Sequence, residues 1–424
     1  MMKEKRMRRA IRVAAVVILA ACGCDPDPTQ VGPNSYGSIR GTVTDNTGAT
    51  VANAPVVLTI NAQAARTTNS GADGVYTFAN VPPGTYALAV RTPPGFAFGT
   101  AAGTASVTVA SGAQVDASAM VLDRVTADFG EWGLRAQLLE PNSELSFAEA
   151  NGKLYLLGGY PASRQTARTV QVYDVASDRW ALGPPLPQPN NHGMAASVNG
   201  TIYLIGGQTT ADDPSYVNTV YALDPTKGEW VAKAPMPTAR SSGVAIVHDG
   251  KIYVAGGRPP RGYDFAVYDT TTDSWEVLPN MPTQRNHLTG AAINGRIHVV
   301  AGRQGQGLSP LMTTAHEVFD PQTRTWTTAA TMARARSGMN GVMARGCFHV
   351  WGGEGPAGMF PDHDYYDPRT NRWVRLPDMP TPVHGVYGSA FVNGLIWASG
   401  GGTNIGGNYG SLHNQVYRPD VSCE

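Results

Sequence analysis

The sequence predicts an all-β fold. Its 424 residues include 49 Gly and 31 Pro and few helix-favouring stretches, a composition typical of short strands joined by turns. Residues 37–123 alternate polar and apolar side chains, which is the pattern of half-buried strands. From about residue 124 a strand-turn-strand segment recurs six times. We therefore expect a small β-sandwich followed by an array of repeated β-hairpins.

The start of the chain predicts export and lipid anchoring. A basic head precedes an apolar run over residues 13–21, which is too short to span a bilayer but suits a signal-peptide core. The run ends in Leu-Ala-Ala-Cys at residues 19–22, which resembles the bacterial lipobox. The resemblance implies removal of residues 1–21 and lipidation of Cys22. Gly23 in place of Asp implies an outer-membrane lipoprotein of the bacterial cell envelope.

Charge argues against a nucleic-acid partner. The chain has 32 Lys and Arg against 32 Asp and Glu, and loss of residues 1–21 removes six basic side chains but only one acidic one. The remaining chain is acidic, whereas a nucleic-acid-binding protein needs a basic surface.

The segment after the lipobox and the cysteines give two smaller expectations. Residues 22–36 are rich in Pro and Asp and are expected to form a tether. In an oxidising compartment Cys347 and Cys423 could form a disulfide, which the sequence leaves open. No two cysteines have CxxC spacing, so a structural zinc site is not expected.

Residues 37–123 predict a β-sandwich, because alternating strands are separated by turn residues about every 8 to 12 positions. The region also resembles the carboxypeptidase regulatory-like, transthyretin-like domain. The matching positions are Gly41, Val43, Asp45, Gly71, Gly74, Tyr76, Phe78, Val81, Pro82, Pro83, Gly84, Tyr86 and Leu88. The resemblance implies an accessory domain without catalytic activity.

The six repeats share one hairpin. In each, the turn glycine stands six residues before a glycine pair, and the repeats begin at Asn151, Asn199, Asp249, Asn294, Arg345 and Asn393. This constancy indicates a fixed register, since a slip of one residue would turn every apolar side chain to the wrong face. Asn-Gly and Asp-Gly suit a type I′ turn. Ala301, which replaces one glycine, and Arg345 are expected to be tolerated variants.

An aromatic residue, an Asp and a Trp follow each of the first five glycine pairs. This succession resembles the kelch repeat, and the spacing of 45 to 51 residues agrees with it. The resemblance implies a β-propeller with four strands per blade. The sixth repeat ends before any tryptophan, while Trp132 lies ahead of the first. We expect residues 124–424 to form a six-bladed propeller, closed when residues 128–136 add a strand beside residues 416–420.

Ligand-binding side chains are expected in the loops of one propeller face. Sixteen residues before the glycine pairs stand Asn142, Asn190, Arg240, Arg285, Arg336 and His384. The loops after the pairs open with Tyr160, Gln208, Arg258, Arg303, Glu354 and Gly402. Because the two inner strands of a blade are antiparallel, both sets should lie on the same face.

We expect the five arginines to crowd the channel mouth, with Asn190 and His384 in the same ring and Glu354 beside them. Guanidinium groups fork onto planar anions, so this predicts a site for a carboxylate, a sulfate or an acidic peptide. The alternative is that arginine at the earlier position bonds the carbonyl oxygens of neighbouring loops. No metal or cofactor is expected: His192 and His287 share these loops, and Asp362, His363 and Asp364 are expected in a solvated loop.

Three functions follow from these observations. The leading hypothesis is a membrane-anchored lipoprotein whose propeller binds a protein or glycan ligand, an anionic one being an option, and is not an enzyme. The alternative is a sugar epimerase similar to the sialic acid mutarotases, with Glu354 as acid/base group beside the arginines. A copper radical oxidase of the galactose oxidase type is disfavoured, because that family has seven blades and Cys347 should lie away from the ring face.

Overall fold

The computed structural model describes residues 36–60, 63–90, 96–98, 104–124, 130–211, 215–305, 311–407 and 409–424. These residues form strands and turns without an α-helix, which confirms the all-β class. The signal segment, Cys22 and the tether lie outside the described residues. No helix in the described part is long and apolar enough to cross a membrane.

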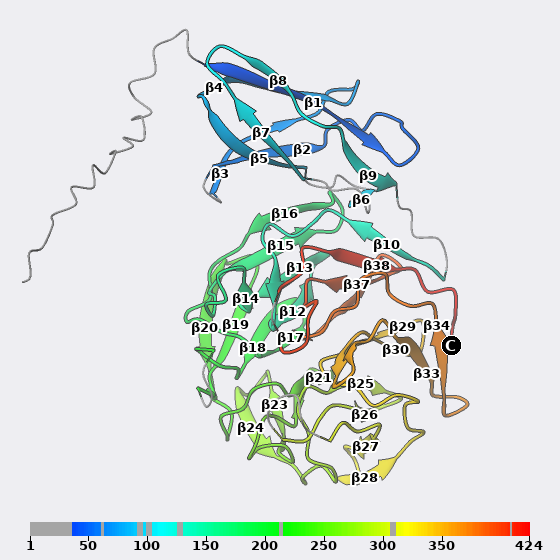
Figure 1. Ribbon diagram of the computed structural model, residues 1–424. Helices are drawn as coiled ribbons and strands as arrows, with labels where there is room; N and C mark the ends of the chain where they lie inside the picture. Colours follow the sequence, from blue (N-terminus) through cyan, green and yellow to red (C-terminus); the bar gives the residue numbers. More distant parts are fainter. Residues whose placement is uncertain are drawn as a thin grey trace, which may run out of the picture.

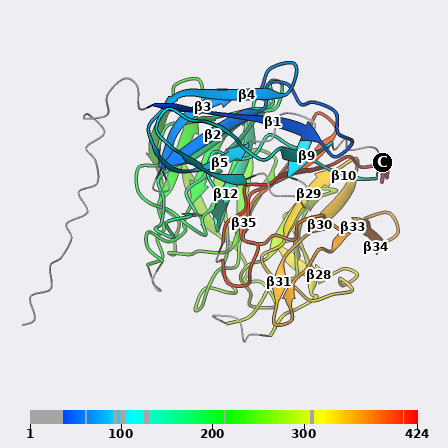
Figure 2. The same ribbon diagram turned by 45° about the horizontal axis from the view of Figure 1, so that its top comes forward.

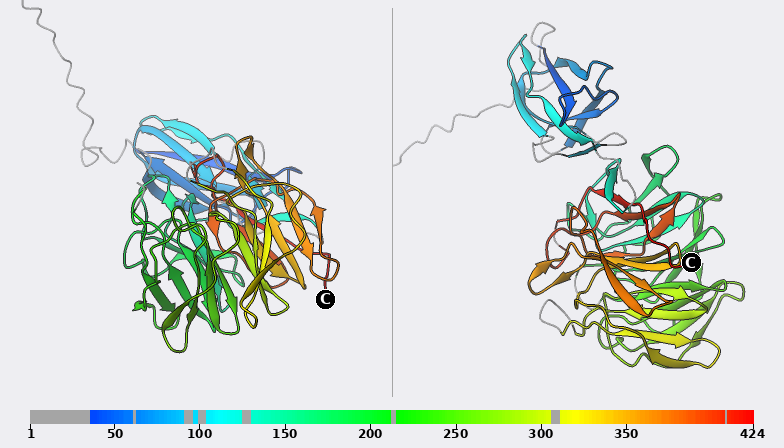
Figure 3. Two further views of the ribbon diagram at one scale, coloured as in Figure 1. Left: turned by 90° about the horizontal axis from the view of Figure 1, so that it is seen from below. Right: turned by 90° about the vertical axis from the view of Figure 1, so that its right-hand side faces the viewer.

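The N-terminal part is a sandwich of two sheets. One contains β1 (Gly37–Asp45), β4 (Val75–Val81), β6 (Phe96–Phe98), β8 (Gln114–Asp116) and β9 (Met120–Arg124). The other contains β2 (Pro55–Ile60), β3 (Gln63–Asn69), β5 (Gly84–Val90) and β7 (Thr104–Val109). Alternate residues of β1 and β5 are buried and join one apolar core. Figure 2 brings this part forward, and the right-hand view of Figure 3 shows it as a body separate from the propeller.

The described residues from 130 onward form one antiparallel sheet for each of the six repeats, arranged around a central axis (Figure 1). Blade one consists of β12 (Leu145–Ala150), β13 (Lys153–Leu157), β15 (Val170–Asp174) and β16 (Arg179–Leu182). Blade two consists of β17 (Met194–Val198), β18 (Thr201–Ile205), β19 (Val220–Asp224) and β20 (Glu229–Lys233). Blade three consists of β21 (Val244–His248), β22 (Lys251–Ala255), β23 (Phe265–Asp269) and β24 (Ser274–Val277). Blade four consists of β25 (Thr289–Ile293), β26 (Arg296–Val300), β27 (His316–Asp320) and β28 (Thr325–Thr328). Blade five consists of β29 (Asn340–Ala344), β30 (Cys347–Trp351), β33 (His363–Asp367) and β34 (Arg372–Leu376). Two short pairs, β11 (Asn142–Ser143) with β14 (Tyr160–Pro161) and β31 (Glu354–Gly355) with β32 (Gly358–Met359), lie in loops.

The hairpin turns adopt the predicted backbone. At Asn151 and Gly152, φ is 55° and 75°, and Arg345 and Gly346 have φ of 50° and 75°. Positive φ at both central residues is what a type I′ turn requires. Arg345 is therefore strained relative to Asn or Asp, but its carbonyl accepts a 2.8 Å hydrogen bond from the Cys423 N–H and so ties down the C-terminal tail.

The chain closes the ring in blade six as expected. This blade contains β36 (Ala390–Val392), β37 (Leu395–Ser399), β38 (Asn414–Tyr417) and, as the outer strand, β10 (Trp132–Arg135), which pairs antiparallel with β38. Trp132 Nε1 donates to the Pro377 carbonyl of blade five at 3.2 Å, just as Trp373 Nε1 donates to Ala330 of blade four at 2.8 Å. A disulfide between Cys347 and Cys423 holds the tail against blade five.

The inner strand of blade six is interrupted. It is split into β35 (Val386–Tyr387) and β36, and β35 pairs in parallel with β12 of blade one. Gly388 separates the two pieces with φ of 126°, and a Cβ there would lie 2.1 Å from the Phe147 carbonyl oxygen. One extra residue in a strand bends it and redirects a side chain. Here the redirected side chain is Tyr387, which turns toward the propeller axis.

Candidate functional site at the propeller mouth

Three of the predicted arginines lie inside the blades. Arg240, Arg285 and Arg336 are at most 1 % exposed. Arg240 Nη1 donates to the carbonyl of Asp264 at 2.9 Å, and Arg285 Nη1 donates to that of Ala315 at 2.9 Å. The expectation that these side chains crowd the mouth is wrong, because each guanidinium turns back along its own blade. The alternative, bonding to neighbouring carbonyl oxygens, describes them.

Carboxylates complete two of these buried arrangements. Arg285 Nη2 lies 2.5 Å from Glu317 Oε2, and Arg336 Nη2 lies 2.7 Å from Asp364 Oδ2. Asp362 lies 3.4 Å from Arg336 and is 5 % exposed, so this acidic segment belongs to the blade interior and is not the solvated loop expected from the sequence.

Asn190 has the same structural role as these arginines. Its Nδ2 donates to the Gly206 carbonyl at 2.8 Å, and Arg240 Nη1 approaches the equivalent Gly256 carbonyl at 3.4 Å. Asn190 is 2 % exposed and does not lie in the mouth, which corrects a second predicted position.

His384 does reach the mouth, but for a reason that the residue count missed. Val383, not His384, holds the repeat position: its carbonyl accepts from Gly353 N–H at 2.8 Å, as the Arg336 carbonyl accepts from Gly302 N–H at 3.0 Å. The extra residue in the inner strand of blade six shifts His384 one place along the loop.

A belt of six residues encircles the axis where the inner strands begin. Five of the six donate their N–H to the carbonyl of the preceding belt residue at 2.7 to 3.0 Å, and the N–H of Leu145, which follows Glu144, closes the ring on the Gly385 carbonyl at 3.2 Å. The belt residues are Glu144, His192, Ser242, His287, Gly338 and Gly385. All six have positive φ, between 51° and 68°. Such a backbone costs free energy in residues other than Gly and is concentrated at functional sites.

Glu144 is the centre of the belt's charge. Its carboxylate lies 3.0 Å from His192 Nε2 and 3.2 Å from His384 Nε2, and it accepts a 3.0 Å hydrogen bond from the Tyr387 hydroxyl. Burial opposes ionisation, but the hydrogen bonds and charge of His192 and His384 outweigh it and hold the pKa of Glu144 well below its usual range. Burial likewise opposes protonation of His384, yet Glu144 and Glu354 raise its pKa above the ordinary value.

The other two mouth arginines each donate to a belt histidine. Arg258 Nη2 lies 3.0 Å from His192 Nε2, and its Nε donates to Ser242 Oγ at 3.2 Å. Arg303 Nη2 lies 2.9 Å from His287 Nε2. Burial, reinforced by Arg303 and Arg258, holds the pKa of His287 well below its ordinary value; burial also lowers that of His192. Burial thus disfavours the protonated form of both imidazoles.

Two asparagines orient these imidazoles. The Nδ1 atoms of His192 and His287 each lie 2.5 Å from the Oδ1 of the preceding residue, Asn191 and Asn286. A donor at Nδ1 leaves Nε2 of His287 free to accept from Arg303, whereas Nε2 of His192 lies 3.0 Å from both Arg258 and Glu144. The same Asn-His-Arg arrangement thus occurs in two places around the mouth.

Glu354 fixes Arg303 and is itself held by the last loop of blade six. Its Oε1 lies 2.6 Å from Arg303 Nη1, and its Oε2 accepts from Gly406 N–H at 2.7 Å. Gly407 N–H donates to His384 Nε2 at 3.0 Å. Arg303, Glu354 and His384 therefore come together as predicted, under a strap formed by residues 403–407.

Glu144 and Tyr387 were missed from the sequence. Glu144 stands two residues after Asn142 in the repeat, the place held by His192 and His287 in later blades, so aligning that position would have found it. Tyr387 had no such signal, because its placement depends on the bulge at Gly388.

Glu144, His192 and His287 also have the chemical types of metal ligands, with ligand atoms within 4.8 Å of one another. The arrangement fits a cation poorly. Each Nε2 atom lies 2.9 to 3.0 Å from an arginine guanidinium nitrogen, and two guanidinium charges at this distance would repel a divalent ion.

Comparisons with known proteins agree with the fold. Residues 114–302 match the KLHDC2/KLHL20/DRC7 Kelch-repeats domain, and residues 38–122 match the carboxypeptidase regulatory-like domain. "Kelch-like protein terF" of Aspergillus terreus (strain NIH 2624 / FGSC A1156) is 34% identical over 88 residues, 20% of this chain and 19% of that protein. The chain thus spans about a fifth of this relative's length.

A solved structure titled "Structure of YjhT" is similar with a TM-score of 0.57 and 17% identity, covering 68% of this chain and 97% of that chain. Identity at this level shows the fold alone. The family models thus match a carboxypeptidase regulatory-like domain followed by kelch repeats, and the structural likeness agrees with a β-propeller.

Proposed function

We propose that this chain is a binding protein whose propeller captures an anionic ligand, from a glycan or a protein, at the mouth cluster. The observation that carries the proposal is the convergence of Arg258 and Arg303 on the belt histidines. The two guanidinium groups and the His384 imidazole lie beside the carboxylates of Glu144 and Glu354, so charged hydrogen-bonding groups of both signs meet at the mouth. Forked guanidinium donors favour a carboxylate as ligand.

The test compares two sugars that differ in one carboxylate. Calorimetry of mature chain carrying Cys22→Ser should show D-galacturonate binding and no comparable binding of D-galactose. Arg258→Gln should weaken galacturonate binding at least tenfold. Arg261→Gln is the matched control, because Arg261 is 44% exposed and lies 3.8 Å from Asp264 outside the cluster. Equal binding of both sugars, or unchanged affinity of Arg258→Gln, would remove the anion site.

We further propose that the protein is held in the outer membrane through Cys22, with no nucleic-acid partner. The support is the lipobox-like sequence, residues 19–22, after a signal-peptide core. In a double-membraned bacterium, wild-type protein should take up labelled palmitate and sediment with outer membranes. Cys22→Ser protein should do neither; retained label would contradict the anchor.

A sugar epimerase similar to the sialic acid mutarotases is the second candidate. One observation favours it: Glu144, His384 and Tyr387 form a hydrogen-bonded group able to exchange protons beside the arginines. Glu354 is bonded to Arg303 and Gly406, so Glu144 is the better acid/base candidate. Polarimetry on freshly dissolved sialic acid and galacturonate should show accelerated mutarotation that Tyr387→Phe reduces. A rate equal to buffer discards this candidate.

A further inference from the structure

Tyr387 spans the belt from the channel side. Its ring centroid lies 5.5 Å from that of His192 and 6.0 Å from that of His287, and its hydroxyl donates to Glu144. One side chain of blade six thus contacts belt residues of blades one, two and four. The Gly388 bulge places it there, and bulges that redirect a side chain are common beside active sites.

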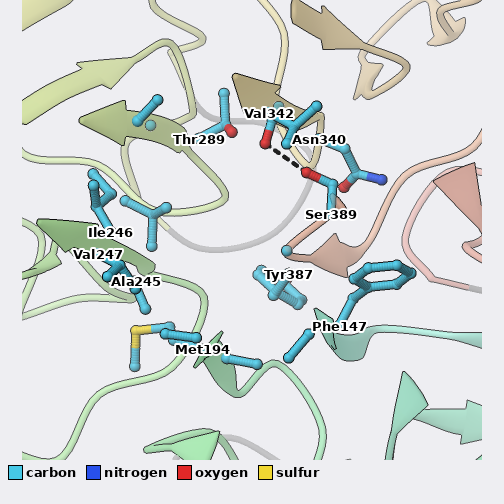
Figure 4. Close-up of a pocket in the computed structure, with 18 of the residues that line it drawn as sticks. Phe147, Met194, Ala245, Ile246, Val247, Thr289, Asn340, Val342, Tyr387 and Ser389 are labelled. Atoms are coloured by element: carbon cyan, nitrogen blue, oxygen red, sulfur yellow. Dashed lines mark hydrogen bonds between the residues drawn. The ribbon is translucent and has the colours of Figure 1, made fainter. Parts of the chain in front are cut away.

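On its other side Tyr387 lines the central channel. The channel is a cavity of about 510 Å³ walled by the inner strands of all six blades. Figure 4 shows Tyr387 among the lining residues, with Phe147 and Met194 nearby and Ala245 and Ile246 across from Ser389. Tyr387 therefore borders both this cavity and the polar cluster.

The loop face offers less access to the deep part of the cluster. Glu144 and His287 are 3 % and 1 % exposed, and the strap at residues 403–407 lies against Glu144, Glu354 and His384. A hydrogen bond from Ser143 Oγ to the Gly407 carbonyl, at 2.8 Å, also joins the strap to the loop that carries Glu144. A sugar or amino-acid residue in the middle of a glycan or protein ligand cannot reach atoms enclosed in this way.

Tyr387 has room to move toward the channel. Gly385 and Gly388 flank it with φ of 68° and 126°, conformations that favour glycine. The groups that the ring contacts on the cluster side are Glu144, His192 and His287. Arg258 and Arg303 bond the two histidines at 3.0 and 2.9 Å.

We propose that the ligand of the mouth cluster is a small anion that enters along the central channel and reaches the belt when the Tyr387 ring moves aside. This rests on the proposed function, and it narrows the ligand from a protein or glycan chain to a free molecule the size of one sugar acid. A hydroxyl group of the ligand takes the place of the Tyr387 hydroxyl as donor to Glu144, and the ligand's carboxylate faces the guanidinium groups.

Blocking the channel tests the route. Ala245→Trp narrows the channel without touching the cluster and should weaken D-galacturonate binding at least tenfold. Ala232→Trp, an exposed site on β20, is the matched control and should bind as wild type. If Ala245→Trp binds normally while Arg258→Gln does not, the channel route is overturned and the anion site stands.

A comparison of a monomer with its polymer tests the ligand class. It uses the mature chain without any substitution. At equal uronate concentration, polygalacturonate should bind at least tenfold more weakly than galacturonate, because only its rare chain ends fit. Binding of the polymer as tight as that of the monomer overturns the inference, even if Arg258→Gln abolishes both.

A chemical probe tests access without any ligand. Diethyl pyrocarbonate modifies neutral imidazoles, and peptide mass spectrometry reports His192 and His287 separately. Tyr387→Ala should raise their modification rates at least tenfold, and adding Ala245→Trp should restore slow modification. Protection that persists in Tyr387→Ala, or fast modification that persists in the double variant, overturns the route. If neither uronate binds, the proposed function fails and this measurement alone decides the route.

Discussion

Arg240 and Arg285 differ from Arg258 and Arg303 in what their guanidinium groups bond, although both pairs come from the loops of neighbouring blades. The first pair is almost fully buried and bonds carbonyl oxygens of its own blade. The second pair bonds side chains of the belt, and His192 and His287 accept its hydrogen bonds.

This difference in bonding partners distinguishes arginines that stabilise the blades from arginines that belong to the candidate site. A guanidinium bonded to backbone carbonyls joins groups that every blade contains, so its role is to hold the blade together. A guanidinium bonded to imidazoles and a hydroxyl joins groups that only some blades contain. Partner identity, more than residue type or burial, therefore distinguishes the two roles.

The largest expected effect comes from removing a blade arginine. Arg285→Ala leaves Glu317 buried without its partner, and breaking a buried ion pair costs about 3 to 5 kcal/mol. Urea unfolding should show this loss in the propeller transition. Arg296→Ala breaks an exposed pair with Asp320 and should cost less than about 1 kcal/mol. A stable Arg285→Ala protein that no longer binds ligand would reverse the assignment.

Acid should weaken the blades through their buried histidines. Burial lowers the pKa of His298 and of His349 to about 3, below the ordinary 6.5 that applies when the chain is unfolded. Because the unfolded chain takes up these protons first, stability falls below pH 6.5, by about 2 kcal/mol per histidine at pH 5. The pKa of His384 is raised, so its contribution is present at low pH and lost as pH rises through that pKa.

Unfolding free energies at pH 7 and pH 5 measure this. The wild type loses unfolding free energy between pH 7 and pH 5. This loss should be about 2 kcal/mol smaller in His349→Gln, because one titrating group is gone. An unchanged difference between the two pH values in that variant would show that His349 does not contribute in this way.

A smaller effect is expected at Asn190. Asn190→Ala leaves the Gly206 carbonyl without its 2.8 Å donor, and an unsatisfied buried acceptor costs about 1 to 3 kcal/mol. Galacturonate affinity should stay within twofold of wild type, since Asn190 does not face the cluster. A loss of binding at wild-type stability would return Asn190 to the site.

Much of the fold could be predicted because it follows from local rules. The Asn-Gly turns require positive φ, the tryptophans recur at one place in each blade, and Trp132 ahead of the first repeat predicted that β10 completes blade six. The loops carrying Arg303, Glu354 and His384 were also placed on one face. These inferences needed only spacing and strand direction.

The remaining features depend on contacts between blades. Sequence spacing could not show that Arg240, Arg285 and Arg336 turn inward, because side-chain direction is set by the carbonyls that the fold presents. One extra residue at Gly388 moved His384 out of phase and brought Tyr387 to the axis. Glu144 owes its role to the closed belt, which exists only when all the blades are assembled.

The smallest expected change in stability, and the sharpest separation of the two roles, is at Arg258. Arg258→Lys keeps the charge, but one ammonium is a poor substitute for a planar fork that reaches Ser242 at 3.2 Å and His192 at 3.0 Å. The free energy of unfolding should change by less than about 1 kcal/mol, the net value of one such hydrogen bond. Galacturonate should nevertheless bind several-fold more weakly by calorimetry, while Arg261→Lys should bind normally. Full binding by Arg258→Lys would mean that charge alone attracts the ligand and that the paired His-Arg geometry does not select it.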